Sequence, residues 1–143
     1  MRMIVICGSA VLAGALFGTP AAAQSSAFLA ANLLGQDVPN GAGDDKGSAN
    51  FNGEVDLKRN RLCYYLDMDG VAGANAVHIH QKDQALTDPP TLPLQVPGPG
   101  GDEVCVNGDN AVLSAIAKTP GDYYIDIHSA DHPDGAVRGV LKE

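Results

Sequence analysis

The feature that most constrains this fold is an alternation of apolar and polar side chains with a period of two residues. Across residues 47–57, apolar side chains at Ala49, Phe51, Val55 and Leu57 are separated by Asn, Glu and Asp residues. Successive side chains of a strand point to opposite faces, so this pattern predicts a strand with one buried face. The chain is therefore expected to build a sheet rather than a helical bundle.

Similar segments recur along the chain and are separated by turn residues. Asn60 marks a turn before residues 61–68, so 47–68 is predicted to be a hairpin. Further strands are predicted over residues 27–34, 74–80, 92–96, 103–106, 123–128 and 136–141. One segment departs from this period, because Asp109 is a suitable N-cap for about two helical turns over 111–117. The predicted fold class is all-β, an antiparallel β-sandwich or barrel with one short helix.

The first 23 residues are predicted to lie outside this fold. Arg2 is followed by a short apolar run, and an Ala-Ala-Ala tripeptide ends at Ala23. This layout is typical of a secretory signal peptide cleaved before Gln24. A membrane anchor is the alternative, but the run is short for a span and no stop-transfer charge cluster follows. We therefore expect a signal peptide over 1–23, one domain over 24–143, and a periplasmic or secreted protein without a membrane span after processing.

Removal of that segment leaves two of the three cysteines, Cys63 and Cys105. In an exported, oxidising compartment, a single remaining pair predicts a disulfide. Two separate buried thiols are the alternative. The formal net charge of −8 argues against a nucleic-acid partner, because binding to phosphates requires a basic face. No nucleophile elbow, phosphate-binding loop or HExxH motif is present, so no catalytic residue is predicted.

Four segments of the chain, in order, resemble the CHRD domain family, which is named after chordin. They are FLAANLLGQDVPNGAGDDKGSANF, LCYYLDMDGV, HIHQ and PGDYYIDIHSADHPDGAVRGVL, and together they extend over nearly all of residues 27–142. The resemblance implies a small extracellular β-sandwich and no settled biochemical activity. The HIH segment is also similar, locally, to a histidine strand of the copper/zinc superoxide dismutases.

All four histidines lie in two short segments, which hold His78 with His80 and His128 with His132. Residues i and i+2 of a strand share a face roughly 6.5–7 Å apart, so two imidazoles can converge on one ion. His128 ends the predicted strand 123–128, and a neighbouring strand could bring it to the same place. Three neutral imidazoles suit Cu(II), Zn(II) or Ni(II). His132 is predicted as a fourth ligand or a lid.

The residues around the histidines leave two interpretations open. Asp126 or Asp131 could orient a ligating imidazole. Arg138, a charge within a predicted strand, either anchors an anion near the histidines or forms a salt bridge with Asp126 or Asp134. The alternative for the HIH segment is purely structural, with the histidines hydrogen-bonded on an outer face.

Our first hypothesis is an exported small binding protein that holds a transition metal, copper first, through this histidine cluster. Its role would be metal binding, delivery or redox buffering. Non-covalent haem held by the same histidines is an alternative, since CxxCH is absent. A metal-free extracellular structural or protein-interaction module is another. A metal-dependent oxidoreductase would need an open coordination position. A homodimer through sheet edges is a further expectation.

Overall fold

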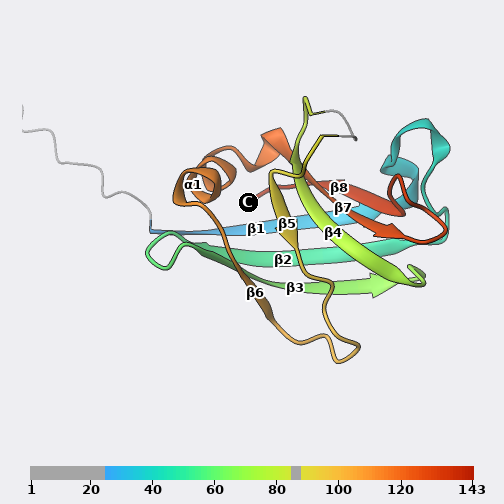
Figure 1. Cartoon of the computed structure of the whole chain (residues 1–143), viewed down its shortest axis with the longest axis horizontal. Helices are drawn as coiled ribbons and strands as arrows, with labels where there is room; N and C mark the ends of the chain where they lie inside the picture. The colour runs from blue at the N-terminus through green and yellow to red at the C-terminus, as the bar shows by residue number, and fades with distance from the viewer. Residues whose placement is uncertain (1–24, 85–87) are drawn as a thin grey trace, which may run out of the picture.

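Eight strands pair in one antiparallel sheet that curls into a nearly closed barrel (Figure 1). The structure is a computed structural model that describes residues 25–84 and 88–143, so the predicted signal peptide lies outside the described residues. The strand order is β5-β4-β7-β8-β1-β2-β3-β6. The strands are β1 (Ser26–Leu34), β2 (Ser48–Asp56), β3 (Arg61–Asp69), β4 (Ala74–Gln81), β5 (Leu92–Leu94), β6 (Val104–Asn107), β7 (Tyr123–Ser129) and β8 (Val137–Val140). Of the two architectures expected from the sequence, the chain adopts the barrel.

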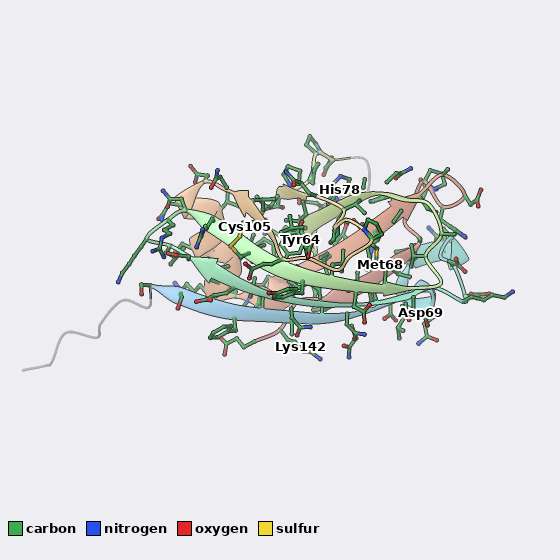
Figure 2. All side chains as sticks on the ribbon, turned by 90° about the horizontal axis from the view of Figure 1, so that it is seen from below. Tyr64, Met68, Asp69, His78, Cys105 and Lys142 are labelled. Atoms are coloured by element: carbon green, nitrogen blue, oxygen red, sulfur yellow. A yellow bond between two sulfur atoms is a disulfide. The ribbon has the colours of Figure 1, made fainter. Side chains whose placement is uncertain are left out.

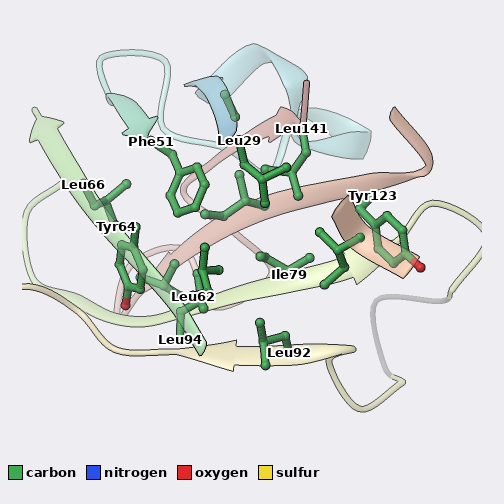
Figure 3. Packing of buried hydrophobic residues seen from close by; sticks show 14 of the residues in the cluster. Leu29, Phe51, Leu62, Tyr64, Leu66, Ile79, Leu92, Leu94, Tyr123 and Leu141 are labelled. Carbon is green, nitrogen blue, oxygen red and sulfur yellow. The ribbon is translucent and has the colours of Figure 1, made fainter. Parts of the chain in front are cut away.

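The alternation predicted from the sequence defines the inner face of the barrel. Leu33, Val55, Leu62, Val77 and Ile125, from five strands, are fully buried in one apolar cluster. Figure 3 shows this core, in which the few aromatic rings are accompanied mainly by Leu and Ile side chains. The apolar side chains at alternate positions of each strand therefore all face one shared interior, as a period of two predicts.

The predicted hairpin over 47–68 is confirmed as β2 and β3, which pair without a bulge from Ser48↔Asp69 to Asp56↔Arg61. Asn60 has a φ of 52°, the left-handed conformation that Asn adopts more readily than most residues and that a tight turn needs. The side chain of Asn110 donates hydrogen bonds to the Leu57 carbonyl and to Asn60 Oδ1. The same turn therefore anchors the start of the helix.

The helix α1 (Asn110–Lys118) begins where the sequence predicts. The Asp109 carboxylate accepts hydrogen bonds from the backbone N–H groups of Ala111 and Val112, which satisfies donors that the helix leaves free. Leu113 and Ile116 are fully buried and join the barrel core. The helix lies at the end of the sheet where β1 begins, and its apolar side chains close that end (Figure 1).

The barrel has one seam, between the edge strands β5 and β6. Tyr64, on β3, is 1% exposed and points inward. Its hydroxyl donates a hydrogen bond to the Gln95 carbonyl (2.6 Å) and accepts one from the Gln95 N–H (2.9 Å), directly after β5. Burial raises the pKa of Tyr64, so the hydroxyl keeps the proton that it donates. The Tyr64 hydroxyl therefore makes, across the seam, the two hydrogen bonds that the backbone N–H and C=O of a neighbouring strand would make in a closed ladder.

The predicted disulfide is present between Cys63 and Cys105, which lie directly opposite each other on β3 and β6. It is the yellow bond beside the label of Cys105 in Figure 2. The bond crosses 42 residues of chain and fixes the short edge strand β6 to the sheet. In the described part of the chain, no helix is long and apolar enough to cross a membrane.

Candidate metal centre

The two histidine segments lie on adjacent strands, β4 and β7. Opposite His78 in the ladder is Asp126, opposite His80 is Tyr124, and opposite Ala76 is His128. Because the residues between them face the core, these polar side chains share the other face of the sheet. The two-residue spacing within each strand and the register between strands together bring four potential ligands into one place.

The four ligand side chains are His78, His80, Asp126 and His128, and their ligand atoms all lie within 4.8 Å of one another. Asp126 Oδ1 is 3.0 Å from His128 Nε2, 3.7 Å from His80 Nε2 and 3.9 Å from His78 Nδ1. His78 Nδ1 is 3.2 Å from His128 Nε2. Tetrahedral centres with bonds of about 2.0–2.1 Å place their ligand atoms roughly 3.3–3.4 Å apart. The four separations above lie within about half an ångström of that value, and the remaining two are no longer than 4.8 Å.

The ring nitrogen of His128 that points away from the cluster, Nδ1, fixes the orientation of the ring. Its Nδ1–H donates a hydrogen bond to the Pro133 carbonyl at 2.9 Å, and a carbonyl can only accept. Nε2 is therefore the nitrogen that faces Asp126 and His78. A carbonyl that fixes the ring and tautomer of an imidazole in this way is the usual support of a metal-ligating histidine. The loop after β7 thus orients the ligand at the end of β7.

The surroundings of the three imidazoles shift their pKa values in different directions. Burial lowers the pKa of His78, and the nearby His128 lowers it further. Burial also lowers the pKa of His80. The hydrogen bond to Asp126 raises the pKa of His128. These shifts favour the neutral form of His78 and His80, which metal binding requires, and favour the protonated form of His128 beside the carboxylate.

Asp126 is fully buried, and its second oxygen is held from β8. Arg138 lies opposite Asp126 in the ladder, and its Nη2 donates to Asp126 Oδ2 at 3.4 Å. The guanidinium also lies 3.9 Å from the centroid of the Tyr124 ring, whose other neighbour is the stacked ring of His80. Of the two partners considered for a structural Arg138, Asp126 is therefore the one it contacts. Because Arg138 contacts Oδ2, the Oδ1 atom of Asp126 is the oxygen that faces the histidines.

His132 is not brought to this cluster. Its Nδ1–H donates to the Ala42 carbonyl at 2.8 Å, and its backbone N–H is bonded to the Ser129 side chain and carbonyl. The bond to Ala42 fastens the loop after β7 to the loop after β1, and the two loops lie side by side in Figure 1. Asp126, which the sequence predicts only to orient a ring, is the fourth potential ligand of the cluster in place of His132.

A second group of potential ligands, Cys63, Glu103 and Cys105, lies on the outer face of β3 and beside β6. Both cysteines are used in the disulfide, so Glu103 is the only ligand that this group offers. The His78/His80/Asp126/His128 cluster is therefore the stronger candidate for a metal ion in the described part of the chain.

The fold and this cluster define a small antiparallel β-barrel with three histidines and a carboxylate gathered on the outside of two adjacent strands. The family model of the CHRD domain matches residues 29–141, and the chain belongs to that family. The match begins in β1 and ends just after β8, so it extends over the whole sheet. Comparison with curated proteins and with solved structures finds no matching relative.

Proposed function

We propose that this chain is an exported metal-binding protein whose cluster of His78, His80, Asp126 and His128 holds one divalent transition-metal ion. The observation that carries the proposal is the orientation of His128. Its Nδ1–H is committed to Pro133, and its Nε2 faces a carboxylate oxygen at 3.0 Å and an imidazole nitrogen at 3.2 Å. A carboxylate oxygen that close to a ring nitrogen whose ring already carries its N–H elsewhere requires either a second proton or a metal ion between the two atoms.

We expect copper(II) to bind this site most tightly. Imidazole nitrogen with one carboxylate oxygen suits copper and zinc, and the affinity of such a set rises along the divalent series to a maximum at copper. A set of four imidazole and carboxylate ligands also suits zinc, which makes zinc the informative competitor. The protein would hold, buffer or deliver the metal ion outside the cytoplasm, in keeping with the predicted signal peptide and with the disulfide.

The haem alternative suits the geometry less well. An axial histidine must direct one ring nitrogen into a slot that accepts a large flat macrocycle. Here His80 Nε2, His128 Nε2 and His78 Nδ1 are directed at one another and at Asp126. The side chain of His80 is also only 4% exposed and stacks on Tyr124. A haemin titration beside the metal titrations distinguishes the two ligands.

The test is a competition titration of the mature chain with Cu(II) and Zn(II) against a chromophoric chelator. We expect one ion per chain and a lower Kd for copper. Loss of a partner that only orients a ligand usually weakens metal binding by about 10–100-fold, so loss of a ligand should cost more than about 100-fold. The variants are His78→Ala, His128→Ala and Asp126→Asn.

His132→Ala is the matched control, because it removes an imidazole of the same chain whose ring is bonded elsewhere. Its Kd should stay within about twofold of the wild-type value. Circular dichroism of each apo variant tests folding. If folded His78→Ala and His128→Ala bind as tightly as the wild type, the metal site is refuted. If both variants unfold without metal, the histidines are structural and the interaction-module alternative is favoured.

A further inference from the structure

A cavity of about 380 Å³ lies on the outer face of β1, β2 and β3, away from the strands that carry the histidines. Its lining includes Phe28, Glu54, Cys63, Tyr65 and Glu103. A volume of this size is within the range of small-molecule sites. Neither the sequence motifs nor the proposed metal site accounts for it.

Two aromatic rings in this cavity are unusually open to solvent. Phe28 is 71% exposed and Tyr65 is 54% exposed, the two highest values among the exposed large hydrophobic residues of the described chain. Phe28 is on β1 opposite Glu54 of β2, and Tyr65 is on β3 opposite Asn52 of β2, so the two residues lie two strands apart and two ladder positions apart. Two strand spacings combined with this two-residue offset put their backbones roughly 12 Å apart on the same outer face. Exposed aromatic side chains that line one cavity are suited to ring stacking or to binding a cation.

Two carboxylates line the same cavity. Glu54 lies between Phe28 and Cys63 in the ladder, so it is on the strand between the two aromatic residues. The Glu103 carboxylate lies within 4.8 Å of the disulfide sulfurs. Among the described residues, neither glutamate carboxylate has an ion-pair or hydrogen-bond partner within the chain. The cavity therefore combines aromatic surface with two negative charges and no internal cation.

We propose that this cavity binds a small organic cation, an ammonium or guanidinium group carried on an apolar body. The aromatic faces attract a cation through their quadrupoles and cover the apolar body, and the carboxylates pair with the charge. An anion would meet Glu54 and Glu103, on a chain whose formal net charge is already −8. A neutral ligand would leave both carboxylates without a partner. This charge complementarity selects the cation over the other two classes.

The experiment is a titration of the folded mature chain, followed by amide chemical shifts in nuclear magnetic resonance. The probes are benzylamine, its neutral match benzyl alcohol, the anion phenylacetate, and the sugar cellobiose. We expect saturable benzylamine shifts on β1–β3 with a millimolar Kd, and binding of benzyl alcohol at least about threefold weaker. Equal affinity for benzylamine and benzyl alcohol overturns the proposal. So does saturable binding of cellobiose or phenylacetate without binding of benzylamine, or binding of none of the probes.

Substitutions of the residues that line the cavity test which side chains contact the cation. Tyr65→Ala and the double variant Glu54→Gln with Glu103→Gln should each raise the Kd for benzylamine by about 3–10-fold. The double variant Asp67→Asn with Asp69→Asn is the matched control, because it removes two negative charges from the next two outward positions of β3 after Tyr65, outside the cavity lining. All these side chains are exposed, so the fold should survive, as circular dichroism can verify. If this control weakens binding as much as the double glutamate variant, the effect is one of net charge and the site is refuted.

Discussion

Replacement of Tyr64 by Phe tests how the barrel is closed. The substitution removes the hydroxyl that donates to the Gln95 carbonyl and accepts from the Gln95 N–H, and it leaves the buried ring in place. Each hydrogen bond of this kind contributes about 1 kcal/mol net, and a buried group left without a partner costs about 1–3 kcal/mol. We therefore expect the free energy of unfolding to fall by about 2 kcal/mol.

The assay is urea unfolding of the apo protein with the disulfide intact. For an m-value of about 1.5 kcal/mol/M, the midpoint should fall by roughly 1.3 M while m stays unchanged. Amide hydrogen exchange should also become faster at Gln95. Tyr65→Phe is the control, since it removes the hydroxyl of the neighbouring, 54% exposed ring, and it should change stability by less than about 0.5 kcal/mol. If both variants lose the same amount, the seam hydrogen bonds do not carry the stability assigned to them.

Three further predictions concern the disulfide, the protons and the processing of the chain. Joint replacement of Cys63 and Cys105 by Ser should lower the free energy of unfolding by about 4 kcal/mol on the chain-entropy model. Thiol counting on the unreduced wild type should find neither Cys63 nor Cys105 free, and two reactive thiols from this pair would contradict the bond. Metal binding near pH 6.5 should release protons, chiefly from His128, because the pKa of His128 is raised whereas those of the other two imidazoles are lowered. Calorimetry in two buffers of different ionisation enthalpy measures this release, and no release would contradict the raised pKa of His128. Intact-mass analysis of exported protein should give a chain that starts at Gln24, and a product that retains Met1 would refute the predicted signal peptide.

The same pKa shifts give the pH dependence of apo stability its sign. The raised pKa of His128 means that its proton stabilises the fold fully below about pH 6.5, and this contribution is lost as the pH rises through the raised value. The lowered pKa values of His78 and His80 act in the opposite direction, with stability present above about pH 6.5 and lost as the pH falls. A bound metal should remove the first dependence, because it takes the place of the His128 proton.

Local patterns were enough to predict most of the secondary structure. The period of two located the strands within one or two residues at most ends, and the Asp109 cap located the helix. These patterns do not distinguish a sandwich from a barrel, because that difference depends on which distant strands pair. The β1–β8 ladder is recorded at Leu34↔Arg138, and no periodicity within either segment indicates that partnership. The same holds for the contact of Tyr64 with Gln95 across the seam.

The candidate site was predicted in part for a similar reason. The spacing of His78 and His80 gave a shared face, and His128 was expected on a neighbouring strand. The central role of Asp126 depends on the β4–β7 register, which places it opposite His78. Its position two residues before His128 was the available signal. The sequence places His132 only four residues after His128, but the turn after β7 directs its ring to the Ala42 carbonyl of another loop.

The short edge strands have a consequence for how this chain behaves at high concentration. Unpaired strand edges are templates on which a second chain can add, and this is a common route to aggregation. Here β5 has three residues with Pro93 at its centre, and β6 has four residues fastened to β3 by the disulfide. A proline cannot donate a ladder hydrogen bond, and so short a strand offers few others. The barrel is therefore protected against intermolecular strand addition, and a dimer built through its edges would first have to open the seam that Tyr64 holds.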